Sequence, residues 1–102
     1  MKLETSFDGQ TKTLSCAIGG EFTYNNADQF KQIYASYEKD ELDRVRIDLA
    51  DTSYIDSTGL GALVIMRATL GKKVSIELLD ANPNVRQSLR YVNIQRFFKL
   101  NW

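Results

Sequence analysis

The chain has 102 residues, which is enough for one domain with a modest core. Hydrophobic residues make up 43% of it and charged residues 25%, the composition of an ordinary globular domain, which excludes a disordered chain. Thirteen Lys and Arg residues balance thirteen Asp and Glu residues, so the net charge of zero argues against nucleic acid and against direct membrane binding.

The first third of the chain predicts a β-hairpin. Polar and apolar residues alternate over residues 2–7 and again over residues 11–18, and an Asp-Gly pair between them supplies a turn. Two consecutive glycines, Gly19 and Gly20, are expected to end the second strand. Cys16 is the single cysteine, so no intrachain disulfide is possible, and we expect it to be a small buried strand residue.

The middle of the chain predicts a helix, a strand and a second helix. Apolar residues at helical spacing indicate a helix over residues 27–37, which Asn25 or Asn26 can cap. Alternation over residues 45–49 indicates a strand. The almost entirely apolar stretch over residues 59–70 indicates a helix with little exposed polar surface.

The last third completes an alternation of strands and helices. Branched aliphatic residues indicate a strand over residues 74–79, and Pro83 at a first helical position indicates a helix over residues 82–92. A short last helix is expected over residues 94–100. The order β-β-α-β-α-β-α-α predicts an α/β fold, a single domain over residues 1–102 in which helices flank a small mixed sheet of about four strands.

Targeting signals are not evident. The first residues, MKLETSFDGQ, lack the apolar core of a signal peptide, and no run approaches the roughly 20 apolar residues of a membrane helix. Together with the lone cysteine, this predicts a cytoplasmic protein of a reducing compartment.

A polar triplet, Asp56-Ser57-Thr58, precedes the second predicted helix and raises the question of catalysis. A serine nucleophile needs a base to take its proton, and the usual base is histidine, of which the chain has none. Lys72 and Lys73 are the remaining bases close in sequence, but a lysine exposed on a turn keeps its proton at neutral pH. We therefore expect a protein that is not an enzyme.

Nucleotide and metal sites are also disfavoured. The pattern of a phosphate-binding loop fails at both its first glycine and its final Ser or Thr, and Gly59 and Gly61 supply only two of the three glycines of a dinucleotide fingerprint. No clear hydrophobic strand precedes them. The acidic residues of this region lack the ligand spacing of a calcium loop; they are Asp48, Asp51 and Asp56. We expect neither a cofactor nor a metal ion.

The remaining alternative is that the triplet starts a helix and also presents a serine for modification. Asp56 or Ser57 can cap the helix over residues 59–70, whose first-turn amides then point outward. Such a helix end favours negative charge by about 0.3–1 kcal/mol near the surface, and it presents a serine in a fixed orientation. Ser57 is a candidate for reversible phosphorylation, although a capping role alone also fits.

The stretch YIDSTGLG, residues 54–61, resembles the signature of STAS domains, specifically that of the small bacterial anti-sigma factor antagonists. In that family an Asp-Ser-Ser/Thr-Gly-Leu-Gly stretch starts the second helix. Residues 20–22, GEF, resemble the family's turn after the second strand, and residues 45–51 resemble its central strand and the lead-in to the site. The resemblance extends over residues 3–100.

This resemblance implies a partner-switching regulator under phosphorylation control. The unmodified domain of the family binds a GHKL-type serine kinase that doubles as an anti-sigma factor, and binding frees the sigma factor. The kinase phosphorylates the serine after the aspartate, here Ser57, with Thr58 as a secondary acceptor, and a PP2C-type phosphatase reverses the reaction. The family often has Asp where this chain has Thr23, close to the phosphorylation site, so kinase recognition is expected to differ.

The second helix supplies a candidate docking face. Helical spacing puts two sets of residues on opposite sides, Leu60, Leu63, Val64 and Arg67 on one, Thr58, Ala62, Ile65 and Thr69 on the other. Ile65 is either an exposed anchor for a partner or packs with Met66 under the last helix. For the aromatic residues near the end, core or end packing is favoured over exposure; they are Phe97, Phe98 and Trp102. The predicted partner-binding residues are Glu21, Thr23, Asp56, Ser57, Thr58, Gly59, Ala62, Ile65 and Thr69.

Two rival functions stay open. A STAS accessory subunit of a membrane transport complex would use the same helix for constitutive binding to an ATPase. A partner-switching regulator whose output is not a sigma factor would have the same sequence features. The phosphorylatable Ser57 favours the regulated versions, since many transport-linked relatives lack such a residue there.

Overall fold

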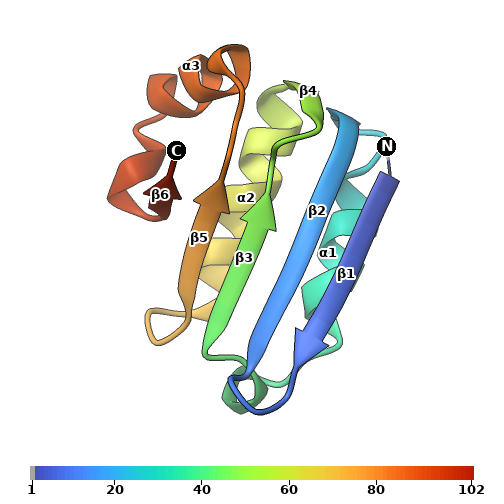
Figure 1. Cartoon of the computed structure of the whole chain (residues 1–102), viewed down its shortest axis with the longest axis vertical. Coiled ribbons are helices and arrows are strands. Elements are labelled where there is room, and N and C mark those ends of the chain that lie inside the picture. Colours follow the sequence, from blue (N-terminus) through green and yellow to red (C-terminus); the bar gives the residue numbers. More distant parts are fainter. Residues whose placement is uncertain (1) are drawn as a thin grey trace.

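The computed structural model describes residues 2–102, with only the backbone of Lys39, and contains one mixed sheet. Five strands lie side by side in the order β1 (Lys2–Asp8), β2 (Thr13–Phe22), β3 (Arg44–Asp48), β5 (Ser75–Leu79) and β6 (Lys99–Asn101), and β4 (Thr52–Ile55) pairs with the end of β2 (Figure 1). Only β1 runs antiparallel to its neighbour; the other pairings are parallel. The predicted α/β class and the mixed sheet are confirmed, with six strands rather than four.

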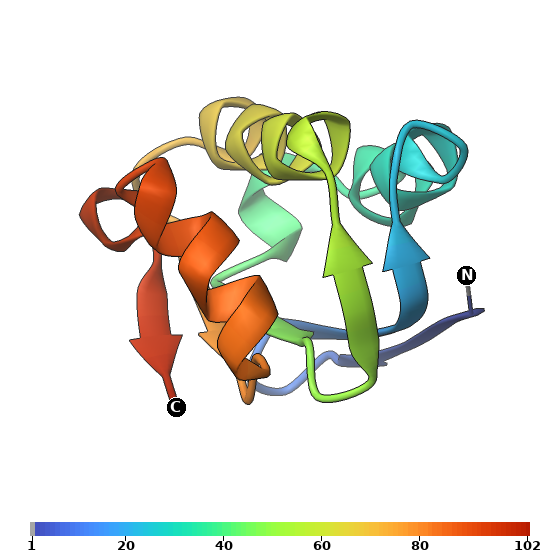
Figure 2. The same cartoon turned by 90° about the horizontal axis from the view of Figure 1, so that it is seen from above.

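The helices lie mainly on one face of this sheet. Helices α1 (Ala27–Ala35) and α2 (Ser57–Leu70) cover that face side by side, and α3 (Pro83–Tyr91) lies beyond the carboxyl end of β5, in contact with β4 (Figures 1 and 2). Two short 3₁₀ helices, η1 (Lys39–Glu41) and η2 (Ile94–Arg96), complete the elements. No helix within residues 2–102 is long and apolar enough to cross a membrane.

The predicted hairpin forms, but its second strand is longer than expected. The prediction that Gly19 and Gly20 end the strand is wrong: β2 continues to Phe22, and the register with β4 shifts between Gly20 and Glu21. Gly20 has a φ of 89°, a conformation that glycine adopts without strain. Glycine here bends the strand at a bulge and does not end it.

Two strands were missed for the same reason, their shortness. The prediction of a helix over residues 94–100 is wrong, because the structure has the single turn of η2 followed by β6. Strand β4 has only four residues, too few to show alternation. Helix α1 also ends at Ala35, before the predicted end at residue 37, and Asn26 occupies its N-cap position without a side-chain cap bond.

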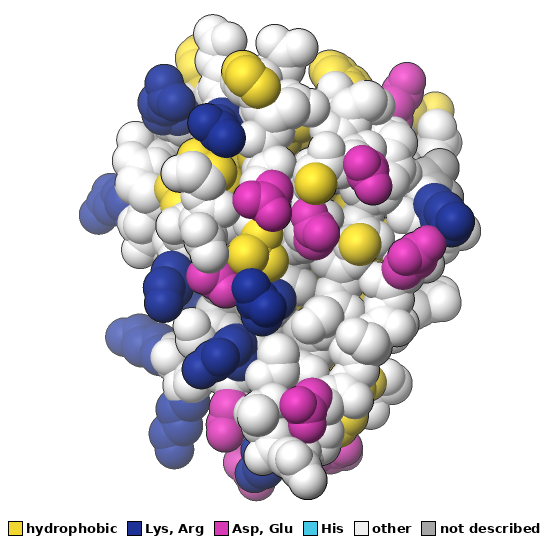
Figure 3. Space-filling model, in the orientation of Figure 1, with side chains coloured by type: hydrophobic (Ala, Val, Ile, Leu, Met, Phe, Trp, Pro, Cys, Tyr) yellow, Lys and Arg dark blue, Asp and Glu magenta, His cyan; other side chains and the backbone are white. Residues whose placement is uncertain are grey.

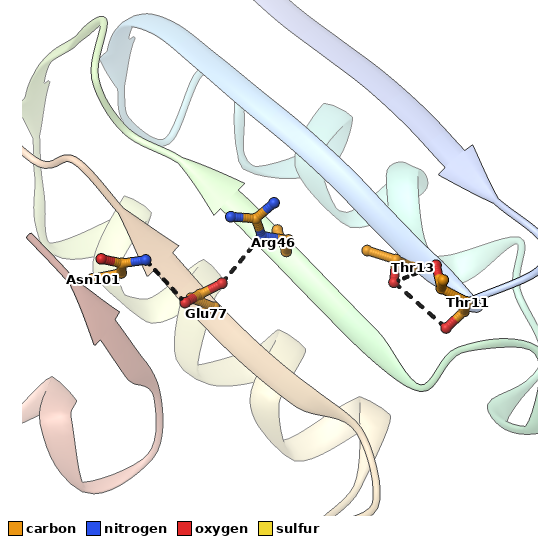
Figure 4. A network of polar contacts seen from close by, with 5 residues as sticks. All are labelled: Thr11, Thr13, Arg46, Glu77 and Asn101. Carbon is orange, nitrogen blue, oxygen red and sulfur yellow. Dashed lines mark hydrogen bonds and ion pairs between the residues drawn. The ribbon is translucent and has the colours of Figure 1, made fainter.

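The sheet face that the helices leave uncovered carries polar side chains, which form an ion pair and hydrogen bonds with one another. The Nε of Arg46 on β3 lies 3.1 Å from Oε1 of Glu77 on β5, and Nδ2 of Asn101 on β6 donates to Oε2 of the same glutamate at 3.3 Å (Figure 4). At the other end of this face, the hydroxyls of Thr11 and Thr13 are 2.9 Å apart (Figure 4). The bond from Asn101 to Glu77 ties the short β6 to β5.

The core fills the space between the sheet and the helices. Cys16 is buried there as predicted, and burial raises the pKa of its thiol from 9.0 to about 11, so the thiol is protonated at neutral pH. Thr52 is the one buried polar side chain in the described part of the chain. Its hydroxyl donates to the Ile18 carbonyl at 2.6 Å, and its own carbonyl accepts from Nδ2 of Asn82 at 2.8 Å. Thr52 therefore joins β2, β4 and the start of α3.

Candidate functional site

The candidate site is the amino-terminal end of α2 and the loop beside it. Parallel pairing places Glu21 opposite Tyr54 and Phe22 opposite Ile55, so β2 and β4 end at the same edge of the sheet. The backbone N–H of Asp56 donates to the Phe22 carbonyl at 3.2 Å, which extends this pairing to the first residue before the helix. The loop after β2 and the start of α2 are therefore neighbours.

Asp56 caps the helix, as one of the two predicted alternatives states. Its Oδ1 accepts a hydrogen bond from the backbone N–H of Gly59 at 2.8 Å, and its carbonyl accepts from the N–H of Leu60 at 2.9 Å. An aspartate in this position satisfies one of the free amides of the first turn and places negative charge at the positive end of the helix. Ser57 is the first helical residue and does not cap; its side chain is exposed.

We expect Asp56→Ala to lower the free energy of unfolding by about 1 kcal/mol, because the Gly59 amide loses its acceptor. Asp56→Asn is the matched control: it keeps an acceptor oxygen of the same reach and should cost only a few tenths of that, through the lost charge at the helix end. Urea unfolding at neutral pH measures both. An equal loss in the two variants would show that the charge, and not the hydrogen bond, stabilises this end.

Gly59 and Ala62, two of the predicted partner-binding residues, are buried against the sheet. An alanine Cβ built at Gly59 would lie 2.4 Å from the Phe22 carbonyl oxygen and 2.9 Å from Cγ1 of Ile55. Ala62 is 9% exposed. These two small residues let α2 lie close to β2 and β4, so they hold the exposed residues in place and offer little surface for contact themselves.

The loop after β2 is held by a local hydrogen-bond pair. The backbone N–H and the hydroxyl of Thr23 both donate to Oδ1 of Asn26, at 3.2 and 3.3 Å. Because Oδ1 of Asn26 already accepts these two hydrogen bonds from Thr23, it does not cap α1. Glu21 is exposed on β2, and Thr23 is half-buried, so the structure brings both predicted residues to the edge where α2 begins.

The structure answers two questions that the sequence left open: whether Ile65 is exposed or packs with Met66, and whether the aromatic residues near the end of the chain are buried. Met66 is 1% exposed and packs in the core, whereas Ile65 is 56% exposed and lies on the surface between Thr58 and Thr69, both exposed. Of the aromatic residues near the end, only Phe98 is buried as expected; Phe97 and Trp102 are partly exposed.

Two exposed aromatic residues beside the site were not predicted. Tyr54 is 53% exposed at the end of β4, and Tyr24 is 70% exposed in the loop after β2. Exposed tyrosines at a surface are frequent anchors of protein interfaces. Recognising the short strand β4 would have indicated Tyr54, since it pairs with the exposed Glu21 across the sheet edge.

The described residues do not assemble a metal site. No group of three or more His, Cys, Asp and Glu side chains in this part of the chain is close enough to hold an ion. The start of α2 and the strand ends beside it offer two exposed hydroxyls, two carboxylates and two tyrosines. It is chemically suited to recognition by another protein.

Residues 5–101 match the family model of the STAS domain. A STAS-domain containing protein of Pseudomonas aeruginosa is 31% identical over 99 residues, which cover 94% of this chain and 93% of that protein.

Solved structures share the fold at low sequence identity. A candidate anti-sigma factor antagonist from Thermotoga maritima has a TM-score of 0.84 at 20% identity, covering 98% of this chain and 86% of that one. The phosphorylated form of the Bacillus cell fate determinant SpoIIAA has a TM-score of 0.69 at 17% identity, covering 97% of this chain and 90% of that one. A sulfate transporter family protein from Wolinella succinogenes has a TM-score of 0.76 at 19% identity, covering 88% of this chain and 76% of that one.

Proposed function

Since the chain belongs to the STAS domain family, we propose that it is a partner-switching regulator of the anti-sigma factor antagonist type, controlled by phosphorylation of Ser57. Unmodified, it binds a GHKL-type serine kinase that also acts as an anti-sigma factor. Phosphorylation at Ser57 releases this partner, and a PP2C-type phosphatase restores binding. The chain itself performs no catalysis.

The observation that carries this proposal is the exposure of Ser57 on a rigid support. The capped first turn, the buried Gly59 and the β2–β4 pairing fix the backbone around it, while its side chain faces solvent. A kinase needs an acceptor hydroxyl that it can reach without unfolding its substrate. Ser57 meets this requirement, and so does the exposed Thr58 as a secondary acceptor.

The surroundings of Ser57 support release as the result of phosphorylation. Asp56 precedes it, and Glu21 is exposed on the adjacent strand β2. A phosphate adds about 1.5 to 2 negative charges at neutral pH to a surface that already carries two carboxylates. A partner that approaches this surface closely must then desolvate more charge, which weakens binding.

The test is affinity capture from cells of the source organism, using wild type, Ser57→Ala and Ser57→Asp. We expect wild type and Ser57→Ala to recover a protein with serine kinase activity, and Ser57→Asp to lose it. The recovered kinase with ATP should phosphorylate wild type and leave Ser57→Ala unmodified. Recovery of the same partner by all three variants contradicts the switch, and a transport ATPase as that partner would establish the constitutive accessory subunit instead.

A further inference from the structure

The net charge of zero conceals a separation of charge along the chain. Residues 57–102 contain seven Lys and Arg residues but only two Asp and Glu residues. Residues 1–56 contain six Lys and Arg residues and eleven Asp and Glu residues. The second segment forms α2, β5, α3, η2 and β6, which lie together on one side of the fold (Figure 1). Figure 3 shows basic side chains gathered on that side, and acidic ones toward the centre and the opposite side.

The basic side carries an apolar groove between α2 and the segment that follows α3. The groove has a volume of about 580 Å³, and its floor is formed by Val64 and Ala68 of α2 and by Phe97 after η2. Val64 is 43% exposed and Phe97 51% exposed, and both line this one groove. The side of α2 that carries Val64 and Ala68 therefore exposes apolar surface that the core does not use.

The rim of the groove is basic. Lys72 and Arg96 line it together with Arg67, and no Asp or Glu is among the lining residues. Arg67 is already engaged, because its guanidinium donates to the carbonyls of Gly71 and Val74 at the end of α2. Lys72 and Arg96 form no ion pair within the described residues, and the guanidinium of Arg96 lies 6.0 Å from the centre of the Phe97 ring.

We propose that this groove binds an amphipathic helix of a partner protein whose apolar face is flanked by Asp and Glu. The apolar floor fits the side chains that such a helix presents at i, i+3, i+4 and i+7, and the basic rim pairs with its acidic flanks. Phe97 is the single aromatic residue of the lining, which favours a helix over a nucleic acid, because nucleic-acid bases require several stacking aromatic rings.

This contact lies away from the site proposed for the switch. Ser57 and Ala68 are eleven residues apart on α2, so they are separated by about 16 Å along the helix. That distance exceeds the screening length of about 8 Å at physiological salt. The groove therefore binds its helix in the same way whether or not Ser57 carries a phosphate, and it can keep a partner close after the contact at Ser57 is lost.

The experiment is a selection from a displayed library of helical peptides of about four turns, with fixed apolar positions and flanks randomised among acidic, basic and neutral residues. Wild type is the only target, so that the selection itself does not favour peptides that depend on Lys72 or Arg96. The enriched peptide is then titrated by fluorescence anisotropy against five proteins: wild type, the charge-reversal variant Lys72→Glu/Arg96→Glu, Ser57→Asp, Phe97→Ala, and Arg90→Glu/Lys99→Glu. The last has the same change in net charge, with both substitutions outside the groove.

We expect the enriched flanks to converge on Asp and Glu, and charge reversal to raise the dissociation constant at least about tenfold. Ser57→Asp and Arg90→Glu/Lys99→Glu should stay within about twofold of wild type, and Phe97→Ala should weaken binding with unchanged thermal stability. The proposal is overturned by peptides that bind wild type and charge reversal equally, by basic flanks, or by competition from a single-stranded oligonucleotide. A wild-type dimer in sedimentation that charge reversal dissociates would identify a second copy as the occupant. None of these results tests whether a kinase modifies Ser57 or whether that modification releases its partner, so the two proposals fail separately.

Discussion

Gly59→Ala is expected to lower the free energy of unfolding by about 3 kcal/mol or more, although it raises intrinsic helix propensity. The added Cβ would lie 2.4 Å from the Phe22 carbonyl oxygen, and this atom belongs to the backbone of β2, which cannot rotate away. To make room, α2 must move off the sheet edge and break the hydrogen bond from Asp56 to Phe22. A loss of this size is a large part of the 5–15 kcal/mol that stabilises a typical domain.

Gly61 provides the matched control, two residues along the same helix. An alanine Cβ there meets no atom within 4 Å, so Gly61→Ala should gain about 0.5–1 kcal/mol from helix propensity alone. Thermal and urea unfolding of both variants measure the difference. Equal stability of the two would mean that α2 can shift freely over β2, and it would remove the argument that a rigid first turn positions Ser57.

Phosphorylation of Ser57 is expected to weaken partner binding at least about tenfold without unfolding the domain. The phosphate lies at the positive end of the α2 dipole, where negative charge is favourable, so the melting temperature should change by no more than about 4 °C. Calorimetric titration with the captured kinase-like partner and thermal unfolding of the phosphorylated protein give the two quantities. This outcome separates release by local charge from release by a change of fold.

Ser6→Asp is the control for this effect, since Ser6 is also exposed but lies on β1, away from α2. It adds the same charge as Ser57→Asp and should leave the affinity unchanged. A large drop in melting temperature on phosphorylation would contradict release without refolding. Similar losses from Ser6→Asp and Ser57→Asp would show that net charge, and not the site, controls binding.

Much of the candidate site could be predicted because its determinants are local. The cap at Asp56 depends on a bond across three residues, and the exposure of Ser57 follows from its place in the first turn. The hairpin likewise follows from alternation and a turn. Such patterns span a few neighbouring residues, so the sequence displays them directly.

What only the tertiary structure decided involves residues far apart in the chain. Strands β4 and β6 are too short to show a period, and they form because β2 and β5 offer unpaired edges to them. The sequence places Gly59 in a surface motif, and only the structure shows that a side chain there would collide with the Phe22 carbonyl oxygen. The exposure of Val64 beside Phe97, and the basic rim around them, likewise depend on where the chain returns after α3. By itself, the sequence determined which segments are helix or strand wherever the periods are long enough, and it determined the helix start at Asp56 that presents Ser57. Packing between distant segments decided the rest, because each such contact needs a partner that no local pattern contains.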